Sequence, residues 1–237
     1  HRVSGFQKPE FLALAAGLEP FDFYKDYIEI LNKAYLNPLS PGSTDNYFFN
    51  IEDTLLVRPD TVYVISFTPY PDKNFLGLRG YLSIHTHGYA LQSIQVNSLD
   101  PNELISIKAE QKYDWIEGQH WFPTQTHATF TFNSLKIMDK PSVGVFRSYA
   151  QDINTAATLK NKDFGAVNVL VKEDAHQKPE EFWKEGRLEA LDKQESNTYE
   201  YLDSLGKESG ADFILSASTA LGTNRLPIQW LDLDLGQ

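Results

Sequence analysis

Apolar and polar residues alternate with a period of two through much of the region between residues 47 and 172. In Thr61–Pro71, for example, Val62 and Val64 fall on one side of an extended chain and Tyr63 and Ile65 on the other. The same alternation returns in the runs Tyr81–His87, Ile94–Val96, Ile105–Glu110, Thr126–Phe132 and Val143–Tyr149. Turn residues separate these runs, among them Pro71-Asp72, Gly77, Gly80, Gly88 and Glu117-Gly118. The pattern predicts an antiparallel meander with one apolar face, because parallel strands would need long crossover helices between them.

Two other regions show helical spacing. Apolar residues in Phe21–Leu36 recur at intervals of three and four, and Pro38 follows, so we expect a helix there. Pro179 opens a second helical stretch, PEEFWKEGRLEAL, and Asp192 with Glu195 resembles a capping box for a further helix. Shorter signals predict a helical turn at 11–16, a strand at 166–172 and an extended exit strand near 226–235.

These elements together predict an α+β fold, in which a strongly curved antiparallel sheet, a half-barrel-like meander, packs against helices. We expect one domain over residues 1–237, with a helical N-terminal segment at about 1–40 and the sheet at about 47–172. A helical segment at about 179–208 and the exit strand at about 226–235 complete the prediction.

Composition narrows the function classes. The 237 residues include 21 basic and 32 acidic side chains, a net charge of −11 with His neutral, and this disfavours nonspecific binding to nucleic acid. The chain has no cysteine, which excludes disulfides, thiolate zinc sites, iron–sulfur clusters and cysteine nucleophiles. It begins His1-Arg2 without methionine, which indicates a fragment or a processed product.

One stretch has an unusual order of residues, Asn74–Leu91, NFLGLRGYLSIHTHGYAL, after the aromatic-rich run Thr61–Pro71. Other short motifs accompany it in a fixed order: PFDFY at 20–24, YLNPLS at 35–40, QKY at 111–113, WFP at 121–123, EFW at 181–183 with Arg187, and Glu195 through DSL at 203–205. On these motifs the chain resembles an uncharacterised family of Gram-negative outer-membrane proteins, a domain-of-unknown-function family.

The resemblance implies a cellular setting and no activity. Members of that family join a carboxypeptidase-regulatory-like domain, a middle periplasmic region and a C-terminal transmembrane β-barrel, and this chain would be the middle region. We therefore expect a non-enzymatic adaptor or binding domain, itself soluble, on the periplasmic face of the outer membrane. Its partners would be its own barrel and, further, other outer-membrane proteins, lipids or glycans, with no nucleic acid and no cofactor.

The order of elements is also similar to periplasmic lipoprotein-carrier half-barrels, which is an analogy at the level of the fold. It keeps open a second function, a pocket for a lipid or a lipoprotein, which would need a continuous apolar cavity. A third alternative is a periplasmic metal-dependent hydrolase.

The hydrolase alternative rests on His85 and His87. Residues two apart on a strand point to the same face, so both rings could bind one metal ion, with His120, His127 or a carboxylate as a third ligand. Two exposed histidines on a solvated strand face explain the same pattern and are the preferred interpretation. We therefore predict no catalytic, cofactor or metal residues.

A second cluster gathers Asp114, Glu117, His120 and Trp121 around one predicted turn. Paired carboxylates beside an aromatic ring are what a glycosidase uses, yet turns are commonly rich in acidic residues for solubility. We expect a solvated turn. Packing roles are predicted for six residues: Phe23, Tyr24, Trp121, Trp183, Arg187 and Asp203.

Overall fold

The computed structural model describes residues 21–30, 33–99, 104–137, 140–155, 179–193 and 195–197. The chain divides into two compact units, one of Leu18–Leu159 and one of His1–Gly17 with Lys160–Gln237. The prediction of a single domain stays a prediction. The helical turn at 11–16, the strand at 166–172 and the exit strand at 226–235 lie outside the described residues.

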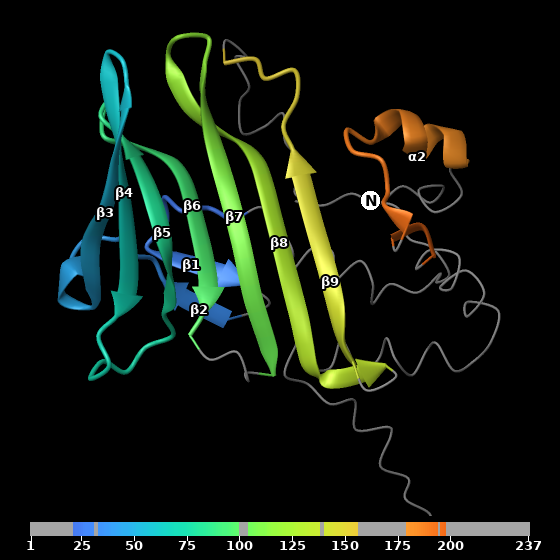
Figure 1. Cartoon of the computed structure of the whole chain (residues 1–237), viewed down its shortest axis with the longest axis horizontal. Helices are drawn as coiled ribbons and strands as arrows, with labels where there is room; N and C mark the ends of the chain where they lie inside the picture. The colour runs from blue at the N-terminus through green and yellow to red at the C-terminus, as the bar shows by residue number, and fades with distance from the viewer. Residues whose placement is uncertain are drawn as a thin grey trace, which may run out of the picture. The chain divides into compact units, whose positions relative to one another are not determined.

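The first unit is built on a seven-stranded antiparallel sheet whose strands follow one another in chain order (Figure 1). Its strands are β3 (Tyr47–Val57), β4 (Asp60–Pro69), β5 (Leu78–His85), β6 (Ala90–Ser98), β7 (Ile105–Ile116), β8 (His120–Ile137) and β9 (Lys140–Tyr149). The predicted meander is confirmed, and β3 and β9 form its two edges. Because every connection is a hairpin, the turns after β3, β5 and β7 share one end of the sheet.

One face of the sheet is apolar. In β7, Ile105, Ile107, Ala109, Gln111 and Tyr113 are buried, and the residues that alternate with them are partly or fully exposed. The same alternation buries Ala128, Phe130 and Phe132 on β8. These side chains share a face across the paired strands, so the core lies against this single face and the other face meets solvent.

The predicted helix at Phe21–Leu36 is wrong. The region forms a two-stranded antiparallel hairpin of β1 (Tyr27–Ile30) and β2 (Lys33–Leu36). Within β1 the burial alternates, with Ile28 and Ile30 buried and Tyr27 exposed, which is a strand pattern. The flat apolar face of the sheet offers a broad surface for burial, and this tertiary gain overrides the local helical spacing.

Asn37 fixes the non-helical path of this segment. Its side-chain amide donates to the carbonyl oxygens of Phe23 at 2.8 Å and of Lys25 at 2.6 Å, and its Oδ1 accepts from the N–H of Leu39. Phe23 is fully buried. These bonds satisfy backbone groups that a helix would have paired internally.

The predicted α+β class, with a strongly curved half-barrel packed against helices, is therefore also wrong. The structure is mostly antiparallel β, and its sheet is neither closed nor strongly curled. The described cover of the apolar face consists of residues 21–30 and 33–36, which include β1 and β2. A single turn of 3-10 helix, η1 (Ser43–Asp45), follows this cover and leads into β3. Helical periodicity in the sequence had implied a helical cover that this region does not form.

A buried polar network joins this cover to the sheet. The Gln111 side chain is 1% exposed, and its Nε2 donates to the Phe21 carbonyl and to the Thr126 hydroxyl, both at 2.9 Å. The Tyr113 hydroxyl donates to Gln111 Oε1, and the Tyr24 ring meets the Tyr113 ring edge-on at 5.8 Å. The Gln111 side-chain amide thus has hydrogen-bond partners at both its nitrogen and its oxygen, as a buried amide requires.

Tyr47 makes a second connection between cover and sheet. Its hydroxyl donates to the Leu36 carbonyl at 2.6 Å and accepts from the Leu78 N–H at 3.4 Å. The ring packs edge-on against Phe67 and Phe75. Burial raises the pKa of Tyr47 to about 12, and the bond from the Leu78 backbone only partly offsets that effect.

We expect Tyr47 to make the fold sensitive to alkaline pH. Its neutral form is favoured in the folded state, so its contribution is complete below the unfolded pKa of about 10 and disappears as the pH rises from about 10 to about 12. The free energy of unfolding should fall by about 2–3 kcal/mol over that range from this group. Urea unfolding of the wild type and of Tyr47→Phe at several pH values checks this: an equally steep decline in both proteins would contradict it.

The second unit is described over a short stretch. Its helix α2 (Glu180–Gly186) starts after Pro179 as predicted, but ends before the expected Leu191. The Phe182 and Trp183 rings meet edge-on at 5.2 Å. The predicted capping box is confirmed, because Glu195 N–H donates to Asp192 Oδ1 at 2.7 Å and Asp192 N–H donates to Glu195 Oε2 at 3.0 Å. Asp203 lies outside the described residues.

Candidate functional site

His85 and His87, which the sequence offered only as weak candidates for metal ligands, lie at the turn between β5 and β6. The His87 backbone N–H donates to His85 Nδ1 at 3.1 Å. The His85 ring lies 5.1 Å from the Trp121 ring, and the His87 ring lies 4.7 Å from the Trp115 ring, measured between centroids. Histidine and tryptophan therefore form one aromatic cluster, which we call the hairpin-end cluster (His85, His87, Trp115 and Trp121).

This cluster connects two hairpins where their backbones no longer pair. The β6–β7 ladder runs from the pair Ser93 and Lys112 to the pair Asn97 and Lys108. Trp115 and Trp121, which pair with each other across β7 and β8, lie beyond that ladder, as do the histidines. Ring contacts of this kind each contribute about 0.5–1.5 kcal/mol beyond burial, so the arrangement explains the histidines as packing groups.

The structure does not bring both candidate third ligands, His120 and His127, into this cluster. His127 is six residues from Trp121 along β8, a separation of roughly 17–20 Å in an extended strand, and its ring packs on Tyr149 at 5.3 Å. His120 is exposed at the start of β8. Among the residues that the structure describes, no group of three or more His, Cys, Asp or Glu side chains is placed to hold a metal ion.

The acidic turn has the position that the sequence predicted. Asp114 Oδ2 accepts from the Thr124 hydroxyl at 2.6 Å, and Glu117 accepts from the Thr155 hydroxyl. Glu117 has a positive φ of 52° and starts the turn that Gly118 continues at 68°. Both carboxylates therefore have local hydrogen-bond partners and lie at the surface of the hairpin.

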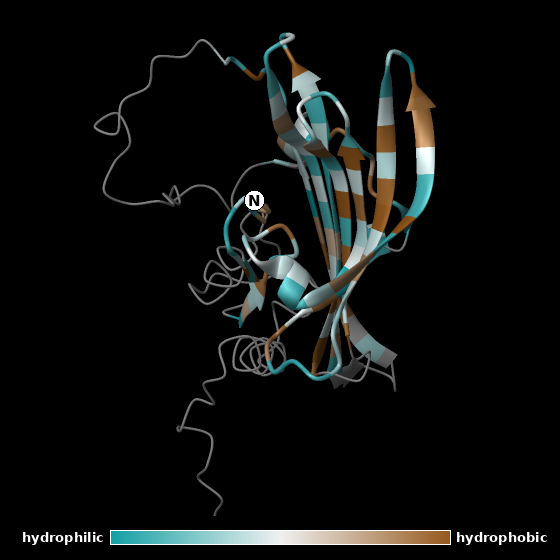
Figure 2. Cartoon of the chain, turned by 90° about the vertical axis from the view of Figure 1, so that its left-hand side faces the viewer, coloured by the Kyte–Doolittle hydropathy of each residue, from teal (hydrophilic) through white to brown (hydrophobic). Residues whose placement is uncertain are grey.

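A different surface stands out on the edge strand β3. From Ile51 to Val57 every residue is exposed, including four large apolar side chains: Ile51 at 61%, Leu55 at 47%, Leu56 at 77% and Val57 at 48%. We call these four residues the edge-strand patch. Figure 2 shows the apolar colour concentrated at the end of β3. Single exposed apolar residues are ordinary on monomers, whereas four of them lie close together on this one edge strand.

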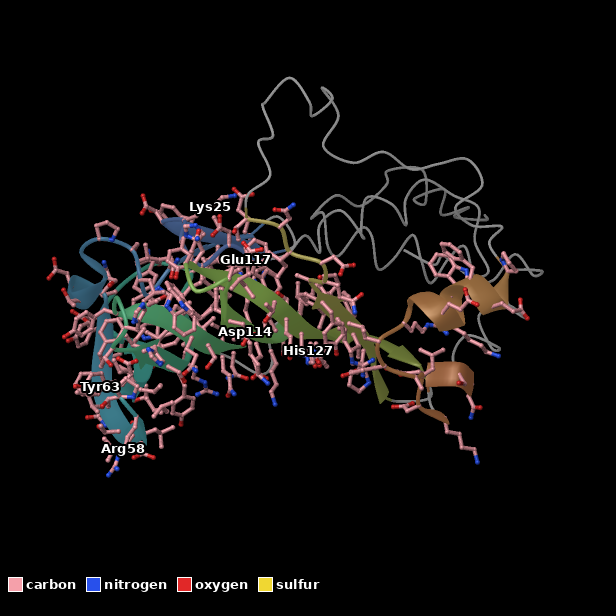
Figure 3. The ribbon with its side chains drawn as sticks, turned by 90° about the horizontal axis from the view of Figure 1, so that it is seen from above. Lys25, Arg58, Tyr63, Asp114, Glu117 and His127 are labelled. Atoms are coloured by element: carbon pink, nitrogen blue, oxygen red, sulfur yellow. The ribbon has the colours of Figure 1, made fainter. Side chains whose placement is uncertain are left out.

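The last three residues of the patch make the ribbon apolar on both sides. Alternation along a strand places Leu55 and Val57 on one face of the sheet and Leu56 on the other. Seen from above, Figure 3 places Arg58 and Tyr63, which mark this ribbon, far from His127 on β8. The edge-strand patch is therefore a separate surface from the strand that carries His127.

Carboxylates border the patch. A register shift between Ile51 and Asp53 places Glu52 in a bulge, where it accepts from the Ser66 hydroxyl at 2.5 Å and from Asn50 Nδ2 at 3.0 Å. The bond from Ser66, and then that from Asn50, lowers the pKa of Glu52 and so favours its charged form. The Asp53 carboxylate accepts from the Thr54 N–H at 2.7 Å. The three residues Leu55–Val57 thus have negative charge before them, and the exposed Arg58 follows them.

Sequence reasoning missed this patch. A signal was present, because Leu55, Leu56 and Val57 are consecutive, and three apolar residues in a row break the alternation of a half-buried strand. Such a run indicates either complete burial or a surface kept apolar for function. Only the sheet order, which leaves β3 at an edge, decides between the two.

A protein-family model described as a family of unknown function, DUF5686, matches residues 2–149. The chain belongs to this family. The match extends through β9, so the hairpin-end cluster and the edge-strand patch both lie in the DUF5686 region. The domain-of-unknown-function part of the resemblance is confirmed, and the outer-membrane context and the regulatory-like neighbour stay predictions.

No curated protein and no solved structure matches the chain. The description of DUF5686 assigns no activity. Within the described ranges, none of the helices combines the length and the apolar character needed to cross a bilayer.

Proposed function

We propose that this DUF5686 chain is a non-enzymatic adaptor domain of an outer-membrane β-barrel protein, located on the periplasmic face of that membrane. The observation that carries the adaptor role is the edge-strand patch, an apolar surface on an edge of the sheet with which no described strand pairs. Membership of DUF5686 and the motifs at 74–91 and 111–123 support the setting, through the resemblance to outer-membrane proteins.

Two features of the patch favour binding over catalysis. Leu55, Leu56 and Val57 carry no group that can act as an acid, a base or a nucleophile. Desolvating them on contact with a partner would be favourable by roughly 25 cal/mol for each Å² of apolar surface removed from water. The sheet beneath holds them in place, so little order has to be gained on binding.

Site-specific cross-linking in the full-length protein tests this function. A photoreactive amino acid at position 56 should give a discrete cross-linked product in native outer membranes, because Leu56 is the most exposed residue of the patch. The matched control carries the same amino acid at Lys108, an exposed position on the polar face of β7. No product at 56, or equal products at both positions, would contradict the adaptor role of the patch.

A further inference from the structure

The open edge of β3 has backbone groups as well as apolar side chains, and the register shows which of them are free. Thr61 N–H donates to the Thr86 hydroxyl at 2.9 Å, and the Thr61 carbonyl accepts from Thr86 N–H at 2.9 Å. Both Thr61 backbone groups therefore point toward the β5 side. Thr61 pairs with Leu56 across the β3–β4 ladder.

In an antiparallel pair of strands, the backbone N–H and carbonyl groups of two opposite residues either all point toward the partner strand or all point away from it. Since the N–H and the carbonyl of Thr61 point away from Leu56, the N–H and the carbonyl of Leu56 point to the outer edge of β3. In the described part of the chain no strand pairs with that edge. Thr54 has the same orientation two residues earlier, and there the Asp53 carboxylate already accepts the Thr54 N–H.

Natural edge strands are protected by charges, prolines and bulges. β3 has such protection in its first part, where the bulge at Glu52 and the carboxylate of Asp53 interrupt the edge. The part from Leu55 to Val57 has none of these, and its apolar side chains frame the free backbone groups of Leu56. An edge with this character is a template for pairing with another strand.

We propose that the edge of β3 from Asp53 to Val57 accepts an extended segment of a partner protein as an added strand. This inference rests on the proposed function and names the partner class of the same patch. The segment would donate to and accept from the Leu56 backbone, and would place apolar side chains beside Leu55, Leu56 and Val57. Charge complementarity with Asp53 and Glu52, in a chain of net charge −11, selects lysine or arginine where the segment lies beside these two carboxylates.

Fluorescence anisotropy with a synthetic probe tests the proposal on the whole chain. The probe is a labelled peptide of about eight residues in which three consecutive valines are flanked on both sides by lysines, long enough for a short strand. The wild type should bind it. The same peptide N-methylated at alternate residues should bind roughly tenfold or more weakly, because it loses backbone hydrogen bonds and keeps its side chains. A valine–glutamate peptide should also bind more weakly.

Three variants separate backbone from side chain at position 56. Leu56→Pro removes the outward N–H and leaves the hydrogen bonds to β4 intact. It should lower the affinity for the valine–lysine probe roughly five- to tenfold. Leu56→Ser keeps the N–H but should also lower the affinity for the probe, because it removes apolar contact. Leu56→Ile, the matched control, should bind like the wild type. If Leu56→Pro fails to fold, the N-methylated peptide still tests the same hydrogen bonds from the other side.

Each other outcome overturns the inference. If the probe does not bind, or binds equally well when N-methylated, β3 does not accept an added strand. A product at position 56 in the membrane cross-linking would then still support the adaptor role, and the loss of both results would refute both proposals. Self-association in sedimentation experiments that Leu56→Pro abolishes would assign the edge to a second copy of this chain. Binding to phosphatidylcholine vesicles that Leu56→Ser abolishes would assign it to lipid.

Discussion

Replacing Gly80 by alanine should unfold the sheet at far lower denaturant than the wild type, with a loss of roughly 4 kcal/mol or more in the free energy of unfolding. A Cβ on Gly80 would lie 1.8 Å from the Gln95 carbonyl oxygen and 3.1 Å from the Val96 Cα, and these are backbone atoms of the neighbouring strand. No side-chain rotation can relieve such contacts, so β5 and β6 would have to separate. Gly80 lies inside β5, paired with Val96, and is not a turn residue as the sequence indicated.

Gly144→Ala provides the matched control for this prediction. Gly144 also lies within a strand of the same sheet, and its added Cβ would meet the Phe132 ring at 3.5 Å, an ordinary van der Waals contact. We expect a change within about 1 kcal/mol, of either sign. Urea unfolding followed by circular dichroism measures both variants. Equal midpoints for Gly80→Ala and Gly144→Ala would show that β5 and β6 tolerate a side chain at this position.

Gln111→Leu should cost about 3–5 kcal/mol of unfolding free energy, although leucine matches the size of glutamine and suits an apolar core. The substitution leaves three buried groups without their partner: the Phe21 carbonyl, the Thr126 hydroxyl and the Tyr113 hydroxyl. Each unsatisfied buried group costs roughly 1–3 kcal/mol, and the gain from burying leucine offsets part of the sum. The loss should appear as release of the cover around Phe21 and Phe23.

Hydrogen exchange identifies where that loss occurs. Amides of β1 and β2 should exchange faster in Gln111→Leu than in the wild type, and the β4–β5 ladder should change less. Gln95→Leu is the control, since Gln95 is exposed on β6 of the same sheet and should change stability by no more than about 0.5 kcal/mol. Unchanged exchange in β1 and β2 would mean that apolar burial alone holds the cover in place.

The sheet could be predicted from the sequence because the alternation of apolar and polar residues is a local pattern. Alternation in Ile105–Ile116 follows from the two-residue period of a strand, and short turns between runs demand antiparallel neighbours. The capping box of Asp192 and Glu195 was accessible for the same reason, since both partners lie within one turn. Neither feature depends on what packs against it.

The conformation of the cover could not be predicted from the sequence, because it depends on a surface formed by residues far away along the chain. Phe21–Leu36 satisfies a helical spacing about as well as a strand one, and its choice follows from contacts with residues such as Gln111, 90 positions from Phe21. The histidine pair shows the same dependence in a candidate site. His85 and His87 were visible as a motif, but the tryptophans that pack on them come from another hairpin.

The amino-acid order alone determined the meander of strands, its apolar face and the family to which the chain belongs, because periodicity and motifs are properties of neighbouring residues. The tertiary structure decided that strands cover the sheet in the described region, that the histidines pack on tryptophan, and that Leu55–Val57 face solvent. The physical reason is that burial is a property of pairs of surfaces. An apolar run becomes buried core or exposed surface according to its position in the sheet, and β3 is at the edge.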